Sequence, residues 1–323
     1  MSSGRREKLV PPEALGDLIA AWLGDADLLA LGGLFKQGRP CALVREVIRG
    51  GRRDLKLVSS PGSGFDVDVL IAADCVAETF LPAVTLETRM CPAFRGAVEA
   101  GTVRAHCVDA LSVVGGLMAA AHGVPFQPVV AWKGSDVPRN NPLAAEITCP
   151  FTGEALFATR AIRPKLALLH AQEGDRYGNI RHLSTMTYAD QMMARASERV
   201  IVSVDRLVST EDIVARSRET TIPCIYVDAV VEMPYGAHPT GSFPLYSIDE
   251  AHIETYADVA EAARRARRDG GPESGRDGSG GAGYGLADYL NRVVHVPATQ
   301  ADYLEAIGGE EHLTALEREA ASL

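Results

Sequence analysis

The sequence predicts an α/β protein with a mostly parallel sheet and helices on both faces of that sheet. Short apolar runs of strand length alternate with helical patterns along most of the 323 residues. Residues 166–170 form a continuous apolar run that ends in His170, which is typical of a strand buried on both faces of a parallel sheet. Glycine-rich loops follow the strands expected at 28–31 and 55–59.

The elements follow from local patterns. An amphipathic helix is expected at 12–23, ended by Gly24, and Pro40 begins a second helix that runs to Arg49. A hairpin is expected at 147–151 and 155–158, and Ser209 is expected to cap the start of a helix. Further strands are expected at 76–80, 103–108, 126–131, 200–204 and 222–231, and further helices at 66–73, 92–100, 111–121 and 189–196.

The chain divides by composition into one domain and an appended C-terminal part. Residues 1–267 carry the alternating pattern. Residues 268–285 are rich in Gly, Ser and charge and are expected to form a flexible surface loop. Residues 286–323 are expected to return as a helical extension packed on the same domain, with helices at 287–293 and 301–307.

Composition excludes several function classes. The net charge of −10 argues against nucleic acid as the main partner. No apolar run reaches the roughly 18 residues of a membrane span, and residues 1–10 lack the apolar core of a secretory signal. The six cysteines show no CxxC or Cys/His spacing, which predicts reduced thiols, a cytoplasmic protein and no metal site.

The most suggestive stretch for chemistry is the glycine turn after the strand at 28–31. Gly32 and Gly33, followed by a basic loop and a helix start, let bare backbone approach an anion or an oxyanion. No GxSxG, GxGxxG or GxxxxGK[ST] motif accompanies it. The carboxylates at strand ends are interpreted as caps, turns or surface ion pairs, and His170 and His238 as hydrogen-bonded structural groups; these carboxylates are Asp109, Asp136, Glu154, Asp175 and Glu232. The catalytic set is therefore incomplete, as expected if another chain supplies the missing group.

An ordered series of short motifs suggests a family. The series begins with Gly32-Gly33 and Arg39-Pro40 and continues through residues 42–46, 55–58, 66–71, 92–97, 123–126, 134–136, 149–154, 175–179, 194–196, 227–231 and 236–240. In this order and spacing the chain resembles the alpha-type chain of family I coenzyme A transferases, such as the glutaconate CoA-transferase alpha subunit. The resemblance covers roughly residues 12–256 and implies the CoA-transferase-like, Rossmann-like fold.

The resemblance implies a heteromeric enzyme, such as a heterotetramer, with its active site between alpha and beta subunits. In such enzymes a beta-subunit glutamate attacks the acyl-CoA and forms a glutamyl-CoA thioester, which a carboxylic acid then exchanges. This chain has no match to the beta-type glutamate–glycine motif, so no catalytic residue is expected in it. Coenzyme A is expected as a substrate, and no permanently bound cofactor is expected.

The site residues implied by the resemblance lie in three loops. Gly32, Gly33 and Leu34 are expected to line the acyl pocket and to present backbone donors. The segments containing Ser60, Gly62 and Ser63 and containing Gly134, Ser135 and Asp136 are expected to close around the substrate. Lys36 and Arg39 are expected to meet a substrate carboxylate or a CoA phosphate, with helix-start and surface charge as the alternative for Lys36.

Two alternatives stay open at this point. One is the branch of the family that opens a steroid-derived ring in a CoA-linked intermediate by adding water. Its members tend to carry extra acidic residues at 103–109, where this chain has only Asp109, with Cys107 and Ala110 at positions often occupied by Glu. The other is a non-catalytic binding subunit. The acyl group, the acceptor acid and the oligomeric state are not determined by the sequence.

Overall fold

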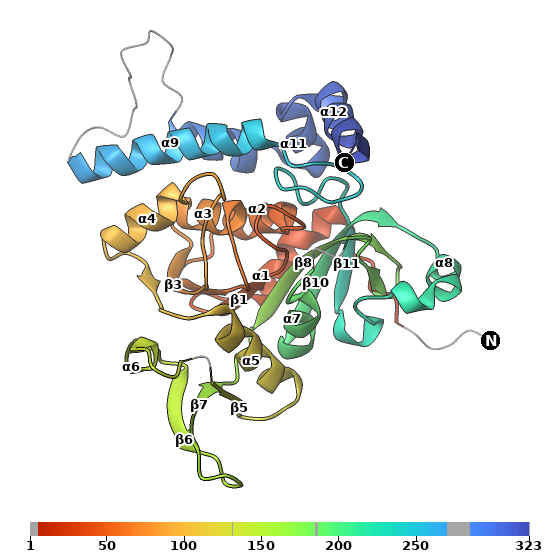
Figure 1. Ribbon diagram of the computed structural model, residues 1–323. Coiled ribbons are helices and arrows are strands. Elements are labelled where there is room, and N and C mark those ends of the chain that lie inside the picture. Colours follow the sequence, from red (N-terminus) through yellow and green to blue (C-terminus); the bar gives the residue numbers. More distant parts are fainter. Residues whose placement is uncertain (1–5, 131, 185–186, 270–284, 323) are drawn as a thin grey trace.

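A single large sheet organises the molecule (Figure 1). The computed structural model describes residues 6–130, 132–184, 187–269 and 285–322. The strand order is β11 (Ala229–Glu232), β10 (Arg199–Leu207), β8 (Leu166–Gly174), β1 (Leu28–Leu31), β2 (Leu55–Val58), β3 (Val76–Phe80) and β4 (Arg104–Ala105). All neighbours in this order are parallel, and β9 (Ile180–Arg181) pairs antiparallel with β8. The predicted mostly parallel sheet is confirmed.

Helices cover both faces of the sheet. One face packs against α1 (Leu15–Trp22), α2 (Cys41–Arg49), α3 (Phe65–Ala72), α4 (Pro92–Glu99) and α9 (Glu250–Asp269), and the other against α5 (Ala110–Ala121) and α7 (Asp190–Ala196). Side chains of β1 alternate between the two cores, with Leu29 and Leu31 in the first and Ala30 in the second. This two-residue period explains why a strand buried on both faces is apolar throughout.

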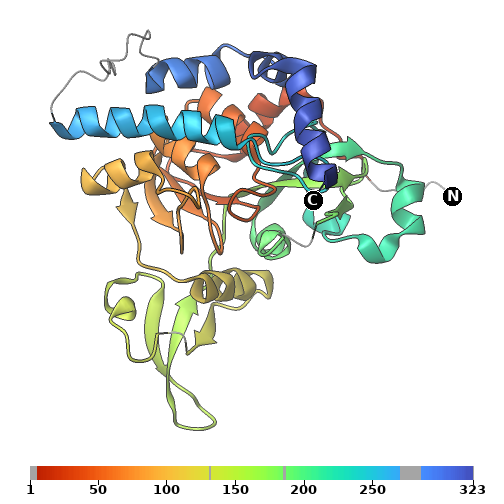
Figure 2. The same ribbon diagram turned by 45° about the horizontal axis from the view of Figure 1, so that its top comes forward.

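A smaller antiparallel sheet projects from the body below α5 (Figures 1 and 2). Its strand order is β5 (Phe126–Val129), β7 (Ala155–Arg160) and β6 (Ala144–Thr148). The short helix α6 (Val137–Asn140) lies in the connection from β5 to β6. The predicted hairpin is confirmed as β6 and β7. The strand expected at 126–131 is β5, an edge strand of this second sheet, where Pro128 needs no amide partner.

Two predicted strands are much shorter in the structure. The strand expected at 103–108 is reduced to β4, and the one expected at 222–231 begins with the 3₁₀ turn η3 (Cys224–Tyr226) before β11. The predicted cap is confirmed, since the Ser209 hydroxyl accepts a hydrogen bond from the Asp212 amide at the start of α8 (Thr210–Ala215). The remaining 3₁₀ turns are η1 (Pro12–Ala14) and η2 (Ser217–Glu219).

The C-terminal segment returns over the helices of the first face. It consists of α10 (Leu286–Leu290), the π-helical turn η4 (Asn291–His295), α11 (Gln300–Ala306) and α12 (Gly309–Ser322), of which α12 was not predicted. Tyr289, Val294 and Tyr303 are buried in the main core. Most of the loop expected at 268–285 lies outside the described residues. In the described part of the chain, no helix is long and apolar enough to cross a bilayer.

Candidate functional site

Two loops lie together at the carboxyl ends of β1 and β2. Because these strands are parallel neighbours, the loop that starts at Gly32 and the loop that starts at Ser59 leave the sheet at the same edge. In open α/β sheets this edge is where ligands bind. The amide of Phe35 donates to the Gly62 carbonyl oxygen at 3.2 Å, and the Ser59 hydroxyl donates to the Leu31 carbonyl oxygen at 2.7 Å. The structure therefore joins two of the three predicted loops.

Arg39 is the centre of this junction. Its side chain is fully buried, and Nη2 donates to Asp66 Oδ2 at 2.6 Å. Nη1 donates to the Gly33 carbonyl at 3.1 Å and lies 3.2 Å from Ser59 Oγ and 3.4 Å from the Gly62 carbonyl. The guanidinium is enclosed and paired with a carboxylate, so in this structure it is not free to meet a substrate anion.

Lys36 also uses its charge within the chain. Its side chain is buried, and Nζ lies 2.5 Å from Glu250 Oε1 and 3.3 Å from Glu87 Oε2. Burial lowers the pKa of Lys36, but the bonds to Glu250 and Glu87 outweigh it, so the pKa lies above its ordinary value. The ammonium group thus ties the β1 loop to α9. In this structure the ammonium group is therefore paired within the chain and not free for a substrate carboxylate or phosphate.

The glycine turn needs glycine for space and for backbone conformation. Gly33 has φ +83°, and a Cβ there would lie 2.6 Å from the Gly38 carbonyl oxygen. The backbone amides of the turn are occupied: Gly32 donates to Leu168, Gly33 donates to Asp190 Oδ1 at 2.9 Å, and Leu34 donates to Gln37. In this structure the three amides are therefore not the free oxyanion donors that the sequence predicted.

Phe35 forms a partly exposed rim beside the turn. Its φ is +49°, which is rare for a bulky side chain and is typical of functional sites. The Phe35 ring covers Gly62 so closely that a Cβ at Gly62 would lie 2.1 Å from it. Ser60 and Ser63 are buried behind this rim, and Ser63 Oγ has no hydrogen-bond partner among the described residues. At this edge Leu34 and Phe35 are therefore more exposed than Ser60 and Ser63.

The third predicted loop belongs to the small subdomain. Gly134 has open space around it, Asp136 makes an exposed ion pair with Arg139, and Ser135 Oγ donates to the Trp132 carbonyl oxygen. The buried Trp132 indole donates to the carboxylate of Asp109 at the start of α5. Ser60 Oγ donates to the Ala110 carbonyl in the same turn at 3.4 Å. Among the hydrogen bonds of the described residues, those of Trp132 and Ser60 therefore link this loop to the second loop through the N-terminus of α5.

Sequence analysis missed a polar niche beneath the glycine turn. A cavity of about 10 Å³ there, room for about one water molecule, is lined by Gly33, Gln37, Gly38, His170, Gln172, His182, Ser184, Thr187, Asp190 and Phe243. Asp190 Oδ2 and His182 Nε2 lie 3.5 Å apart in it, and neither makes a hydrogen bond to the described residues. No linear motif connects them with Gly33, because His182 follows β9 and Asp190 begins α7, 157 positions after Gly33.

The candidate carboxylates are held by the chain itself. Asp109 caps α5, Asp175 accepts from the Tyr177 and Asn179 amides, and Glu232 accepts from the Leu207 amide. Glu154 pairs with Lys133 on the surface. The two histidines are buried and hydrogen-bonded, as expected: His170 to Ser203 and Asp205, and His238 to Tyr303 and Asp249.

Comparison with known proteins shows the family. The family described as Coenzyme A transferase matches residues 13–233. The chain belongs to the coenzyme A transferase family. It is 34% identical over 255 residues to the alpha-type chain of 3-oxoadipate CoA-transferase from Pseudomonas knackmussii, which covers 76% of this chain and 87% of the relative. It is 32% identical over 277 residues to the cholesterol ring-cleaving hydrolase IpdA subunit of Rhodococcus jostii, covering 81% and 89%.

A solved structure gives the same result at the level of the fold. Glutaconate coenzyme A-transferase from Acidaminococcus fermentans superposes with a TM-score of 0.80 at 26% identity, covering 96% of this chain and 95% of that one. The resemblance found in the sequence is thus confirmed. This CoA-transferase chain is the alpha subunit of a heteromeric CoA-transferase, which implies a partner subunit.

Asp190 offers a direct test of how the glycine turn is held in this CoA-transferase chain. We expect Asp190→Ala, assayed with the partner subunit, to lower kcat/KM about tenfold or more, because a charge-assisted bond to Gly33 of about 1.5–3 kcal/mol is lost. Asp190→Asn keeps an oxygen acceptor and should retain most of the activity. Steady-state kinetics on both variants measure this, and unchanged kcat/KM in Asp190→Ala would contradict a positioning role.

Proposed function

We propose that this alpha subunit forms one wall of an intersubunit site in which CoA moves from an acyl-CoA to a carboxylic acid. A glutamate of the partner beta-type subunit receives the CoA as a glutamyl-CoA thioester and passes it to the acceptor acid. In each exchange one carboxylate becomes the acyl part of a CoA thioester, and the former acyl group leaves as a carboxylate. Water is therefore not consumed. No cofactor other than the CoA substrate takes part.

The observation that carries this proposal is how the carboxylates near the carboxyl ends of the strands are hydrogen-bonded and buried. Asp109, Asp175 and Asp190 each accept a hydrogen bond from a backbone amide of this chain. Asp66 is buried against Arg39. A carboxylate nucleophile must approach a thioester carbonyl with a free oxygen. Asp109 and Asp175 are held in a cap and a turn, and the remaining oxygens of Asp66 and Asp190 are buried, which favours a nucleophile supplied from the partner.

This chain then contributes the shape and the rigidity of one wall of the site. Leu34 and Phe35 present the partly exposed surface of the β1 loop, and Arg39, Lys36 and Asp190 hold that loop from behind. Such a preorganised wall positions a bound thioester, and misplacement by about 1 Å costs on the order of 100-fold in rate. Lys36, Arg39 and Asp190 are thus positioning residues, not catalytic residues.

We also propose that the acyl group or the acceptor is a dicarboxylic acid. The names of two relatives support this class, since 3-oxoadipate and glutaconate each carry two carboxylates. The relative named as a ring-cleaving hydrolase defines the competing outcome. At the positions where that branch tends to be acidic, this chain has Cys107 and Ala110, which favours the transferase.

The test is co-expression with the beta-type chain of the neighbouring reading frame. The complex, but neither chain alone, should convert an acyl-CoA only when a carboxylic acid acceptor is added. Intact mass spectrometry after incubation with acyl-CoA should find the CoA adduct on the partner chain. Turnover by this chain alone would sink the intersubunit site. Consumption of acyl-CoA without an acceptor would instead identify a hydrolase.

A further inference from the structure

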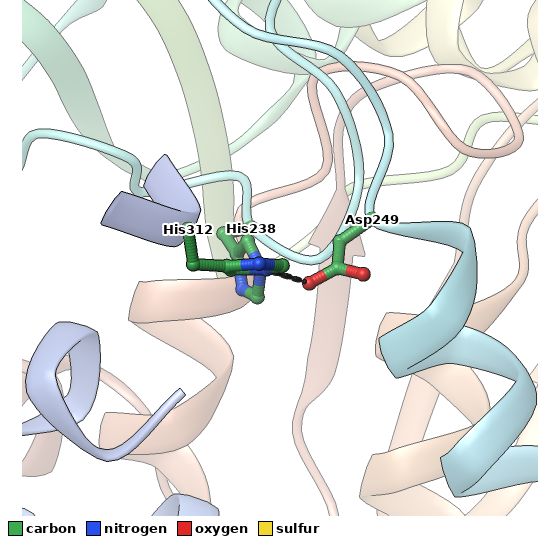
Figure 3. Close-up of side chains that lie close together, drawn as sticks. All are labelled: His238, Asp249 and His312. Atoms are coloured by element: carbon green, nitrogen blue, oxygen red, sulfur yellow. Dashed lines mark hydrogen bonds and ion pairs between the residues drawn. The ribbon is translucent and has the colours of Figure 1, made fainter. Parts of the chain in front are cut away.

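Three polar side chains from distant parts of the chain come together beside α12 (Figure 3). His238 lies in the loop after β11, Asp249 immediately precedes α9, and His312 lies in α12. His238 Nε2 is 3.0 Å and His312 Nε2 is 2.6 Å from the same oxygen, Asp249 Oδ2. The three atoms all lie within 4.8 Å of one another. Two imidazole nitrogens and one carboxylate oxygen therefore face a common point.

We propose that His238, Asp249 and His312 form a binding site for a divalent transition metal ion of the zinc type. Imidazole nitrogen and carboxylate oxygen are zinc ligands, at about 2.0–2.2 Å from the ion. Tetrahedral ligands at that distance are about 3.3 Å apart. The two measured separations from Asp249 differ from this value by less than about 1 Å, so side-chain adjustment alone admits the ion.

Outer contacts hold two of the three ligands in position. His238 Nδ1 lies 2.7 Å from the Tyr303 hydroxyl, which leaves Nε2 directed at the carboxylate. Asp249 Oδ1 accepts from the His252 amide at 2.9 Å, which leaves Oδ2 directed at the histidines. Such second contacts on the far atom of a ligand are typical of metal sites, because they orient the ring and the carboxylate.

Exposure differs among the three ligands in a way that suits an open coordination position. The side chains of His238 and Asp249 are 0% and 5% exposed, whereas that of His312 is 33% exposed. Water can therefore reach the ion from the side of α12 and complete a set of four ligands. Release of the ion would free α12 first, since His312 is the ligand nearest to solvent.

The three ligands lie C-terminal to the residues that the family description matches, although His238 belongs to the motif at 236–240. That match ends at residue 233, and all three ligands follow it. The ion would join α12 to the residue that precedes α9 and to the loop after β11. Its role is then to fasten the C-terminal helices. This inference does not depend on the proposed transfer reaction.

The sequence expectation of no metal site rested on linear spacing. His238 and Asp249 are 11 residues apart, and Asp249 and His312 are 63 apart. Neither interval belongs to a compact motif, and the candidate ligands meet only after α12 packs on the body of the protein.

The experiment measures metal content and metal-dependent stability of the full-length chain. Protein purified without chelators should contain about one zinc ion per chain by plasma mass spectrometry. After chelation, added Zn²⁺ should raise the melting temperature by several degrees, since an ion that binds the folded state stabilises it. His312→Gln should abolish both effects. His122→Gln, at an exposed helix end, is the matched control and should change neither.

Cobalt substitution distinguishes this site from thiol binding. Cys107 is exposed and is the competing ligand to exclude. Co²⁺ bound to nitrogen and oxygen should give visible absorption without the near-ultraviolet charge-transfer band of a thiolate complex. Absence of zinc and of any Zn²⁺-dependent shift in the wild-type chain would overturn the proposal in favour of a plain hydrogen-bond network. Equal behaviour of wild type and His312→Gln would overturn it as well.

Discussion

Replacing Arg39 by methionine is expected to lower the free energy of unfolding by about 3–5 kcal/mol. Methionine keeps the apolar stem but leaves Asp66, which is fully buried, without its only charged partner in the described structure. It also removes the donor that holds the carbonyls of Gly33 and Gly62. Urea denaturation followed by circular dichroism measures the change, and both loops of the candidate site should loosen together.

The matched control is Arg199→Met. Arg199 pairs with Asp228 at 2.9 Å, but the two side chains are 51% and 30% exposed. Solvent screens such a pair, so we expect a loss below about 1 kcal/mol. Adding Asp66→Asn to the Arg39→Met chain should recover part of the lost stability, because the uncompensated buried charge disappears. Equal losses in Arg39→Met and Arg199→Met would contradict the role assigned to the buried pair.

Gly33→Ala is expected to lower kcat/KM of the assembled enzyme by about 100-fold. The new methyl group would lie 2.6 Å from the Gly38 carbonyl oxygen and 2.7 Å from that of Gln37, so the backbone of the β1 loop must move. The wall formed by Leu34 and Phe35 moves with it. Kinetics with the partner subunit, together with size-exclusion chromatography, separate loss of turnover from loss of assembly.

Gly51→Ala isolates the contribution of backbone conformation. Gly51 has φ +63°, similar to the +83° of Gly33, but a Cβ there meets nothing within 4 Å. It should therefore cost only the strain of a left-handed residue, about 1–2 kcal/mol, and leave kcat/KM unchanged. Full activity of Gly33→Ala would show that the turn does not shape the site. Low activity with intact assembly would exclude a purely scaffolding subunit.

Local patterns predicted the elements of the fold well where one element decides its own structure. The glycine turn after β1, the helix that begins beside Pro40 and the Ser209 cap depend on residues within a few positions of each other. The predictions failed where the structure of an element depends on a strand that is distant in the sequence. β4 pairs with β3 over two positions only, and β5 joins β7 in the smaller sheet. Sheet membership is a long-range property, which period and propensity do not encode.

The candidate site divides in the same way. The sequence indicated the loops at Gly32, at Ser59 and at Gly134, because glycine and polar residues mark strand ends. The resemblance assigned Lys36 and Arg39 to a ligand, with surface charge as the alternative for Lys36, because the sequence does not show which carboxylates lie beside them. Their partners, Glu250 and Asp66, lie 214 and 27 positions away. Asp190, which holds Gly33 from 157 positions away, had no local signal at all.

Amino-acid pattern alone was enough for the parallel α/β architecture and for the family, since these follow from periodic burial and from ordered motifs. Which charges are free depends on how the chain packs. Packing buried Arg39 and Lys36 against carboxylates, occupied the amides of the glycine turn, and brought His238, Asp249 and His312 together. The physical reason is that the protonation, pairing and direction of a polar group depend on its neighbours in space, and the fold alone selects those neighbours.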